Sequence, residues 1–458
     1  MLKSFANIFR IPDLKKKVIF TLLLLMVERV GCYVPSPFID PVAVKKFFST
    51  QMAGLLSFID LFSGGAFSNM TIMALGIMPY ITTSIIMQLL VVVIPFLERL
   101  SKEGEAGRKA INKYTRWGTV FVCMFQSLGI AVWMLKEGLT ANVSRSGFLF
   151  ITMISMTAGT IFLMWLGEKI TEHGIGNGIS LIIMAGIVAR FPNAIILIVK
   201  QLNPFWMILL AAIIVGITAF IVVLQLAQRR IPIQHAKRVV GRKMMTGQSS
   251  FLPLRINTAG VIPIIFAASI LTFPATIMQF FGGKEGFLGG IASIFSSYSP
   301  YNLYNLLQVV FGMETGGFFY IFKIVNFYTF IYLLMIIFFC YFYTAITFNP
   351  IEIADNLKKY GAFIPGRRPG KYTSDYIYFI LNRITLVGAV CLALIAIIPQ
   401  VLTVSYNIPY TIAQFTGGTG MIIVVGVALE TVRQIESHLI MRNYSGFMKR
   451  GSGSKGYY

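Results

Sequence analysis

Ionisable residues are nearly absent from the long apolar segments of this 458-residue chain. Glu28, Arg29 and Arg190 lie near segment ends, and the interiors of the segments carry almost no charge. Proton-coupled pumps and transporters need ionisable groups inside the membrane. A proton relay is therefore not expected, and any energy source must come from a partner or from the membrane potential.

Cysteine and histidine are also scarce, with four and three residues. Cys32, Cys123, Cys340 and Cys391 are scattered through apolar segments without CxxC spacing, which supports neither a disulfide framework nor a metal site. The sequence contains no HExxH, GxSxG or GxxxxGK(S/T) motif. It therefore predicts no enzyme activity, no bound metal and no cofactor.

Apolar residues are abundant and make up 56% of the chain. A helix that crosses a bilayer core needs about 20 of them in a row. Nine stretches predict ten membrane-spanning helices, because the last stretch is long enough for two spans and has a polar, proline-containing middle. These are Val18–Val34, Leu61–Leu97, Trp117–Leu135, Ser146–Gly167, Ile179–Lys200, Gln201–Gln228, Ile256–Gly283, Ile324–Ile351 and Ile384–Leu429. The uncharged stretch 286–313 is interpreted as a polar outer loop.

Basic residues alternate between the two sides of these spans. With ten spans, 29 of the 39 Lys and Arg residues fall in loops and ends on one side. The positive-inside rule places that side, with both termini, in the cytoplasm. The net charge of +22 is therefore displayed mostly on one face. Part of this positive charge follows from the positive-inside rule, which applies to membrane proteins in general. The rest is compatible with an acidic partner such as RNA or an acidic protein surface.

The segment that precedes the second span is unlike a simple helix. It runs from Leu61 to Asn69, contains Gly64 and Gly65, and follows the apolar residues 55–59. Because glycine lowers helix propensity, we expect a short, weakly held element at the outer membrane surface. An interfacial loop is the alternative.

Two large inner loops, 229–255 and 348–377, carry concentrated basic charge. In the first, the alternating Ile231 and Ile233, followed by Val239 and Val240 beside Gly241, predict a short hairpin projecting into the cytoplasm. Glycine and proline in the second predict a shaped tip. The pair is interpreted as a docking platform, with a solvated basic face as the alternative for each loop.

Several stretches resemble the SecY family, whose members form the central channel subunit of the bacterial protein translocase. The resemblance covers nearly the whole chain and keeps the order of the family motifs. The matching stretches are Phe62–Ala66, Met70–Leu90, Phe162–Glu168, Thr171–Ser180, Asn257–Pro263, Phe348–Pro350 and Ala354–Gly370.

The resemblance implies an all-α, polytopic membrane protein of the bacterial cytoplasmic membrane. Ten transmembrane helices would form two pseudo-symmetric halves of five around an hourglass pore, with cytoplasmic N- and C-termini. The N-terminal half would cover residues 1–200, the C-terminal half 201–435 and a cytoplasmic tail 436–458. The implied activity is a protein-conducting channel that translocates unfolded secretory polypeptides and releases membrane segments laterally. A multi-span secondary transporter for a small solute is the alternative.

The resemblance also implies site residues, position by position. The pore ring would comprise Ile77, Ile81, Ile179, Ile183, Ile265 and Ile423. A plug at about 55–70 would include Phe62, Ser63, Gly64, Gly65, Phe67 and Asn69. The lateral gate would contain Thr82, Thr83, Gln126, Asn257 and Phe273. The docking surface would present Arg242, Lys243, Arg255, Lys358, Lys359, Arg367 and Arg368.

Partners follow from the same resemblance. The SecE and SecG subunits would complete the channel, and the SecA motor ATPase or the ribosome, through its RNA and proteins, would dock on the inner loops. Signal sequences and nascent polypeptides would enter the pore, and the gate would open toward membrane lipids. Glu28 departs from the family pattern, which has an apolar residue there, and we expect it to pair locally or with a partner subunit.

Overall fold

The structure is a computed structural model that describes residues 11–51, 55–140, 144–201, 203–235, 238–240, 243–245, 249–281, 327–406, 408, 412–413, 415 and 417–452. Helices dominate these residues. They are α2 (Pro12–Gly31), α3 (Pro41–Gln51), α4 (Leu55–Ser63), α5 (Met78–Val93), α6 (Pro95–Lys102), α7 (Glu105–Lys136), α8 (Arg145–His173), α9 (Gly178–Val188), α10 (Phe191–Gln201), α11 (Pro204–Leu226), α12 (Ile262–Phe281), α16 (Phe327–Thr347), α17 (Pro350–Lys359), α18 (Lys371–Tyr406) and α20 (Thr419–Ser452). The strands are β1 (Gln228–His235), β2 (Arg238–Val240), β3 (Lys243–Met245), β4 (Ser249–Arg255) and β5 (Ala362–Phe363). The predicted outer loop 286–313 and the docking residue Arg242 lie outside the described residues.

Each of the ten predicted spans falls on a helix or on a pair of consecutive helices. They correspond to α2, α5, α7, α8, α9 with α10, α11, α12, α16, α18 and α20. Within the described part of the chain, six spans are long and apolar enough to cross a membrane, or seven if the bent pair α5 and α6 forms one span. Helices α2 and α20 carry too many charged residues to enter this count.

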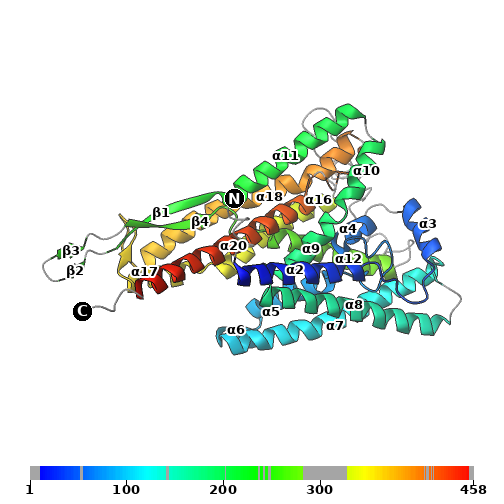
Figure 1. Ribbon diagram of the computed structural model, residues 1–458, viewed down its shortest axis with the longest axis horizontal. Helices are drawn as coiled ribbons and strands as arrows, with labels where there is room; N and C mark the ends of the chain where they lie inside the picture. Colours follow the sequence, from blue (N-terminus) through cyan, green and yellow to red (C-terminus); the bar gives the residue numbers. More distant parts are fainter. Residues whose placement is uncertain are drawn as a thin grey trace, which may run out of the picture.

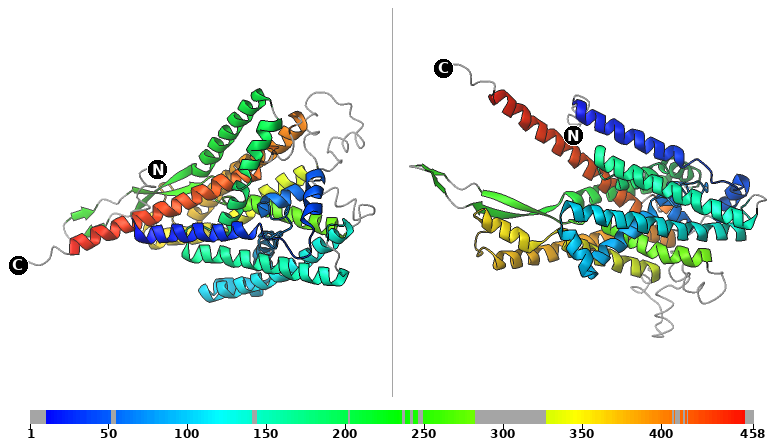
Figure 2. Two further views of the ribbon diagram at one scale, coloured as in Figure 1. Left: turned by 45° about the vertical axis from the view of Figure 1, so that its right-hand side comes forward. Right: turned by 90° about the horizontal axis from the view of Figure 1, so that it is seen from below.

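The helices lie side by side along the long axis of the molecule (Figures 1 and 2). The start of α2, the end of α20, α17 and the strands gather toward one end, while α3, α4 and α10 lie toward the other (Figure 1). This arrangement agrees with the prediction that both termini and both basic loops share one side.

One large apolar core joins the first and second halves of the chain. It takes buried side chains from α5, α8, α9, α11, α12, α16, α18 and α20. A second cluster forms near the α3 and α4 end, where residues 59–75 meet α3, α7 and α8. The segment before the second span therefore belongs to the interior of the protein.

The predicted second span, Leu61–Leu97, does not form one continuous helix. Residues 64–77 form turns, and α5 begins only at Met78, next to Pro79. Gly64 and Gly76 have φ values of 62° and 58°, in the left-handed region that side chains disfavour. At the other end, the chain bends by 98° between α5 and α6, where Pro95 starts the new helix. A search for uncharged runs could not reveal these breaks, because residues 64–77 and α5 are both uncharged.

The two basic loops join into one small sheet at the end of the molecule where α17 lies (Figure 1). Strand β1 pairs antiparallel with β4 and, on its other edge, with β5 of the second loop. Strands β2 and β3 pair separately. The predicted hairpin exists: Val239 of β2 lies opposite Met244 of β3, and Ile231 of β1 lies opposite Leu252 of β4. Buried Ile231, Leu254, Ile364 and Ile377 form the apolar cluster beneath this sheet.

Candidate functional site

The six isoleucines of the implied ring lie in or against the main core. Ile77, Ile81, Ile183, Ile265 and Ile423 are at most 5% exposed and belong to one cluster, and Ile179 packs against it. Ile77 and Ile81 come from the start of α5, Ile179 and Ile183 from α9, and the last two from α12 and α20. Contacts of α5 with α12 and of α9 with α20 bring these four helices together. The interior where these four helices meet is therefore lined by aliphatic side chains.

The turn between α8 and α9 positions two of these isoleucines. The side chain of Asn177 caps α9 by accepting hydrogen bonds from the backbone nitrogens of Ile179 (3.1 Å) and Ser180 (3.4 Å). A Cβ atom on Gly178 would lie 2.0 Å from the carbonyl oxygen of Gly167, so only glycine permits this approach. Gln434 of α20 accepts a hydrogen bond of 2.8 Å from the backbone nitrogen of Gly176. These contacts fix the positions of α8, α9 and α20 relative to one another.

The element 55–70 consists of α4 and the turns that follow it. Phe62, Ser63 and Phe67 are buried, Gly64 and Gly65 are partly buried, and Asn69 is exposed. Phe67 stacks on Trp133 of α7, with ring centroids 6.5 Å apart, and meets Phe48 of α3 edge to face at 5.6 Å. The alternative of an interfacial loop does not fit this burial.

Two ion pairs hold the element 55–70, so the prediction of a weakly held segment was wrong. Arg29 pairs with Glu28 and donates from Nη1 to the carbonyl oxygen of Gly64 at 3.3 Å. Arg190 pairs with the fully buried Asp60. Of the two pairings predicted for Glu28, the local one is present. Each charge is compensated where it is buried, as the low dielectric of a protein interior requires.

Asp60 was not predicted from the sequence as a functional residue, although its isolated charge could have indicated it. It is the only charged residue between Lys46 and Glu98. It stands immediately before an apolar run, so the hydropathy pattern placed it at a boundary. An isolated carboxylate in such surroundings requires a partner, and Arg190 is far away in sequence.

Three of the implied gate residues line a common cavity. Thr82 of α5, Gln126 of α7 and Phe273 of α12 enclose about 30 Å³ together with residues of α4, α5, α7 and α12. The other lining residues are Ile59, Phe67, Leu75, Met78, Ile130, Ser269, Thr272 and Thr276. The cavity therefore adjoins the element 55–70.

The remaining two gate residues do not join that cavity. Thr83 lies against α7, since a Cβ on Gly118 would be 2.7 Å from its Cγ2 atom. Asn257 is buried and donates from Nδ2 to the carbonyl oxygen of Gly260 at 3.0 Å, within its own turn. The five implied gate residues therefore do not all lie in one cavity. Asn257 satisfies its amide within its own turn, before α12 begins.

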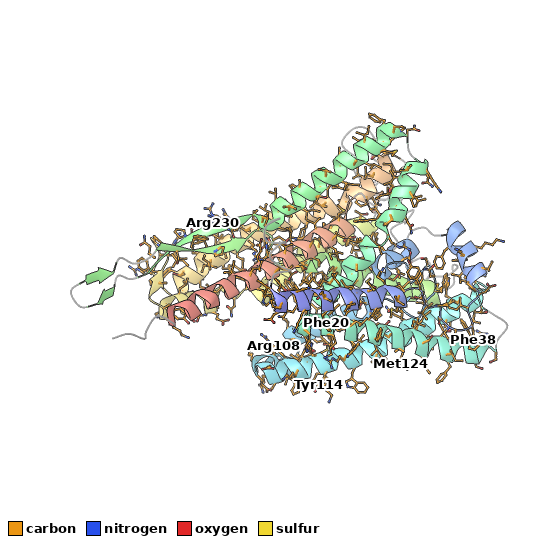
Figure 3. The ribbon with its side chains drawn as sticks, viewed as in Figure 1. Phe20, Phe38, Arg108, Tyr114, Met124 and Arg230 are labelled. Atoms are coloured by element: carbon orange, nitrogen blue, oxygen red, sulfur yellow. The ribbon has the colours of Figure 1, made fainter. Side chains whose placement is uncertain are left out.

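The basic residues of the two loops lie in or near the strands and α17. Arg255 ends β4, Lys358 and Lys359 lie in the last turn of α17, and all three are exposed. Arg230 of β1, labelled in Figure 3, was not among the predicted docking residues. Its Cζ atom lies 4.9 Å from the ring centre of Phe251. Lys243 lies in β3. The pairing of β1 with β4 and β5 brings basic residues of both loops to the same end of the molecule (Figure 1).

The tip of the second loop presents two arginines differently. Arg367 stacks over Tyr376, with Cζ 4.8 Å from the ring centre. Arg368 is exposed, and its carbonyl oxygen accepts a hydrogen bond of 2.9 Å from Thr373 Oγ1 at the start of α18. The backbone at Arg368 is fixed while its side chain faces solvent, which suits contact with an acidic partner.

Comparisons with known proteins agree with this geometry. A family model described as SecY matches residues 71–432. The chain is 43% identical over 455 residues to "Protein translocase subunit SecY" of Aquifex aeolicus (strain VF5), covering 97% of this chain and 98% of that protein. It resembles the solved structure of a protein conducting channel, with a TM-score of 0.61, 18% identity and coverage of 92% and 91% of the two chains. It also resembles Sec61 in the canine ribosome-channel complex from the endoplasmic reticulum, with a TM-score of 0.58, 17% identity and the same coverages of 92% and 91%.

Proposed function

The chain belongs to the SecY family, and we propose that it is the protein-conducting subunit of a translocase in the bacterial cytoplasmic membrane. It passes unfolded secretory polypeptides across the membrane and releases apolar segments of membrane proteins sideways into the lipid. The chain spans the membrane many times and presents its basic loops to the cytoplasm. Residues 71–432, which match the family, contain all six ring isoleucines.

The observation that carries the proposal is the convergence of six uncharged, branched side chains from four helices in one core cluster. An aliphatic constriction gates by dewetting and offers ions no binding site. Its side chains contact an extended polypeptide of any sequence by adjusting their rotamers. A ring of charge would instead retain some substrates and reject others. A channel for chemically diverse chains is therefore a better match than a carrier for one solute.

A secondary transporter is the less favoured function. Carriers bind a polar or ionic solute near the bilayer midplane, often between broken helices. Both ion pairs described above contact the element 55–70, and in each pair the arginine already compensates the charge of a buried carboxylate. The family to which the chain belongs supports the channel and gives the transporter no support.

Within this proposal the chain divides into halves at residues 1–200 and 201–435, with the tail 436–458 in the cytoplasm. The element 55–70 acts as the plug that closes the outer side of the ring. The seam between α5 and α7 on one side and α12 and α16 on the other acts as the lateral gate. Support comes from the contacts of α12 with both α5 and α7 and from the cavity between them.

The proposed partners bind the cytoplasmic surface. The solved relative in the canine complex is a ribosome-bound channel. We assign the ribosome and the SecA motor ATPase to the basic surface around β1, β4, α17 and the tip at Arg368, where an acidic partner is complemented in charge. SecE and SecG are proposed to complete the channel as companion subunits. The SecA motor or the elongating ribosome supplies the free energy that moves the polypeptide through the channel.

Photocrosslinking from the ring tests the proposed function. A photoreactive amino acid at Ile81 or Ile183 is expected to crosslink to a stalled secretory chain in membranes that contain SecE and either SecA or ribosomes. Both positions are buried in the core cluster, so the probe meets a polypeptide only if it passes through the interior.

The matched control carries the probe at Leu22 of α2, which is 59% exposed on the outer surface of the helices. That probe is expected to give no signal-dependent crosslink to the stalled chain. If assembled, partner-bound channels gave no crosslink from either ring position, the pore assignment would be wrong and the transporter would regain support.

A second prediction concerns the gate. Asn257→Leu is expected to increase export of proteins with defective signal sequences about fivefold, because one buried hydrogen bond is worth about 1 kcal/mol. The lost bond joins Nδ2 to the Gly260 carbonyl and holds the turn that leads into α12. Export of a reporter with a weakened signal measures the effect. Thr258→Val, in the same turn, serves as the control, and equal export by Asn257→Leu and the wild type would count against a gate role.

A further inference from the structure

Arg190 binds the element 55–70 at two points. Its guanidinium pairs with the carboxylate of Asp60, and its Nη2 atom donates to Ser68 Oγ at 3.1 Å. The carboxylate also accepts a hydrogen bond of 2.8 Å from the backbone nitrogen of Ser68. Asp60, Ser68 and Arg190 thus form a closed network that joins both ends of the turn to the end of α9.

Backbone contact fixes the place of this network. A Cβ atom on Gly64, whose φ is 62°, would lie 2.6 Å from the Cα atom of Gly186. Arg190 follows Gly186 by four residues and lies just beyond the end of α9, so the approach sets the arginine opposite Asp60. The network is built into the contact between the two elements and is not a chance meeting of surface charges.

The Asp60–Arg190 pair differs from the Glu28–Arg29 pair in its dependence on conformation. Glu28 and Arg29 are neighbours in α2, so they stay paired whether or not the element 55–70 moves. Asp60 and Arg190 belong to different elements, and displacement of one from the other separates them. Only the second pair distinguishes the docked position of the element 55–70 from a displaced one.

We infer that Asp60 and Arg190 form a latch that determines how strong a signal sequence must be to open this channel. The inference rests on the proposed function and assigns specificity to two residues outside the ring. A strong signal supplies enough binding free energy to separate the charges, which then recover hydration in the opened, wetted channel. A weak signal does not, and the element 55–70 stays docked.

Removing one member of the latch leaves the other buried without a partner, which is far less favourable than the intact pair. The docked position is then destabilised while the displaced one is not. Asp60→Asn and Arg190→Gln are each expected to raise the resting conductance of the channel roughly tenfold or more. The double variant Asp60→Asn, Arg190→Gln is expected to conduct no more than the leakier single variant, because the two residues act through one interaction.

The experiment measures potassium chloride conductance of the purified channel, assembled with its companion subunits in planar bilayers without substrate. Export of a reporter with a defective signal is measured in parallel and is expected to rise in the same variants. Arg145→Gln and Asp40→Asn remove charges elsewhere on the same side and are the matched controls. Arg190 is partly exposed, so Arg190→Gln carries the test alone if Asp60→Asn does not assemble.

Wild-type conductance in both single variants would overturn the latch, as would a double variant whose increase equals the product of the two single increases. Translocation of a normal secretory protein by the wild-type channel is measured in the same membranes. If the wild type translocates and the single variants do not leak, the latch alone fails. If the wild type does not translocate, the proposed function fails.

Discussion

A channel carrying Arg368→Glu is expected to assemble normally and to lose most of its motor- or ribosome-driven transport. The turn that presents Arg368 is anchored, because its carbonyl oxygen binds Thr373 Oγ1 at 2.9 Å. The substitution therefore changes the charge that meets the partner and leaves the backbone in place. A repulsive charge in a complementary interface costs several kcal/mol, so we expect driven transport to fall roughly 100-fold or more.

Translocation into membrane vesicles, driven by SecA or by ribosomes, measures this effect, and the amount of assembled complex is measured beside it. Where the partner surface is ribosomal RNA, binding should weaken with salt, and the slope of log affinity against log salt should fall by about one unit in the variant. Lys136→Glu, at the end of α7 on the predicted outer side, is the control and should transport normally. Normal driven transport by Arg368→Glu would exclude this residue from the docking surface.

The second large effect is expected from Gly159→Val, which should prevent assembly of the channel. Gly159 lies in α8 against the turn before α5, and a Cβ atom there would be 2.0 Å from the carbonyl oxygen of Ile72. Relief of this clash requires movement of backbone on both sides. Overpacking of this kind costs about 3 kcal/mol or more, a large part of the stability of a domain.

The measurements are the amount of folded protein in the membrane and its melting temperature in detergent. Gly216→Val is the matched control, because Gly216 lies inside α11 and a Cβ there meets no atom within 4 Å. Both variants place the same side chain in an apolar helix, so a difference between them reports the contact with Ile72. Equal stability of the two variants would show that α8 and this turn do not pack as described.

Residues that face a partner could be recognised from sequence more readily than residues that face each other. Lys358, Lys359 and Arg368 stand out because they belong to a loop in which basic residues are concentrated. Their roles rest on the family resemblance, and the structure adds only that the two loops share a sheet through β1 and β5. By contrast, the role of Asp60 and Arg190 can be recognised only once the structure shows that they form an ion pair.

The order of the apolar segments, the concentration of basic residues in two loops and the hairpin of the first loop could all be predicted from the sequence. These properties are local, since hydropathy sums over about 20 neighbouring residues and charge follows the same windows. Only the tertiary structure shows that the turns continue through residue 77, that the chain bends between α5 and α6, and that Asn257 bonds within its own turn. It also decided that Arg190 reaches Ser68, 122 positions away. Such contacts depend on which helices meet, and isoleucines or isolated charges carry no local signal of the neighbours that will surround them.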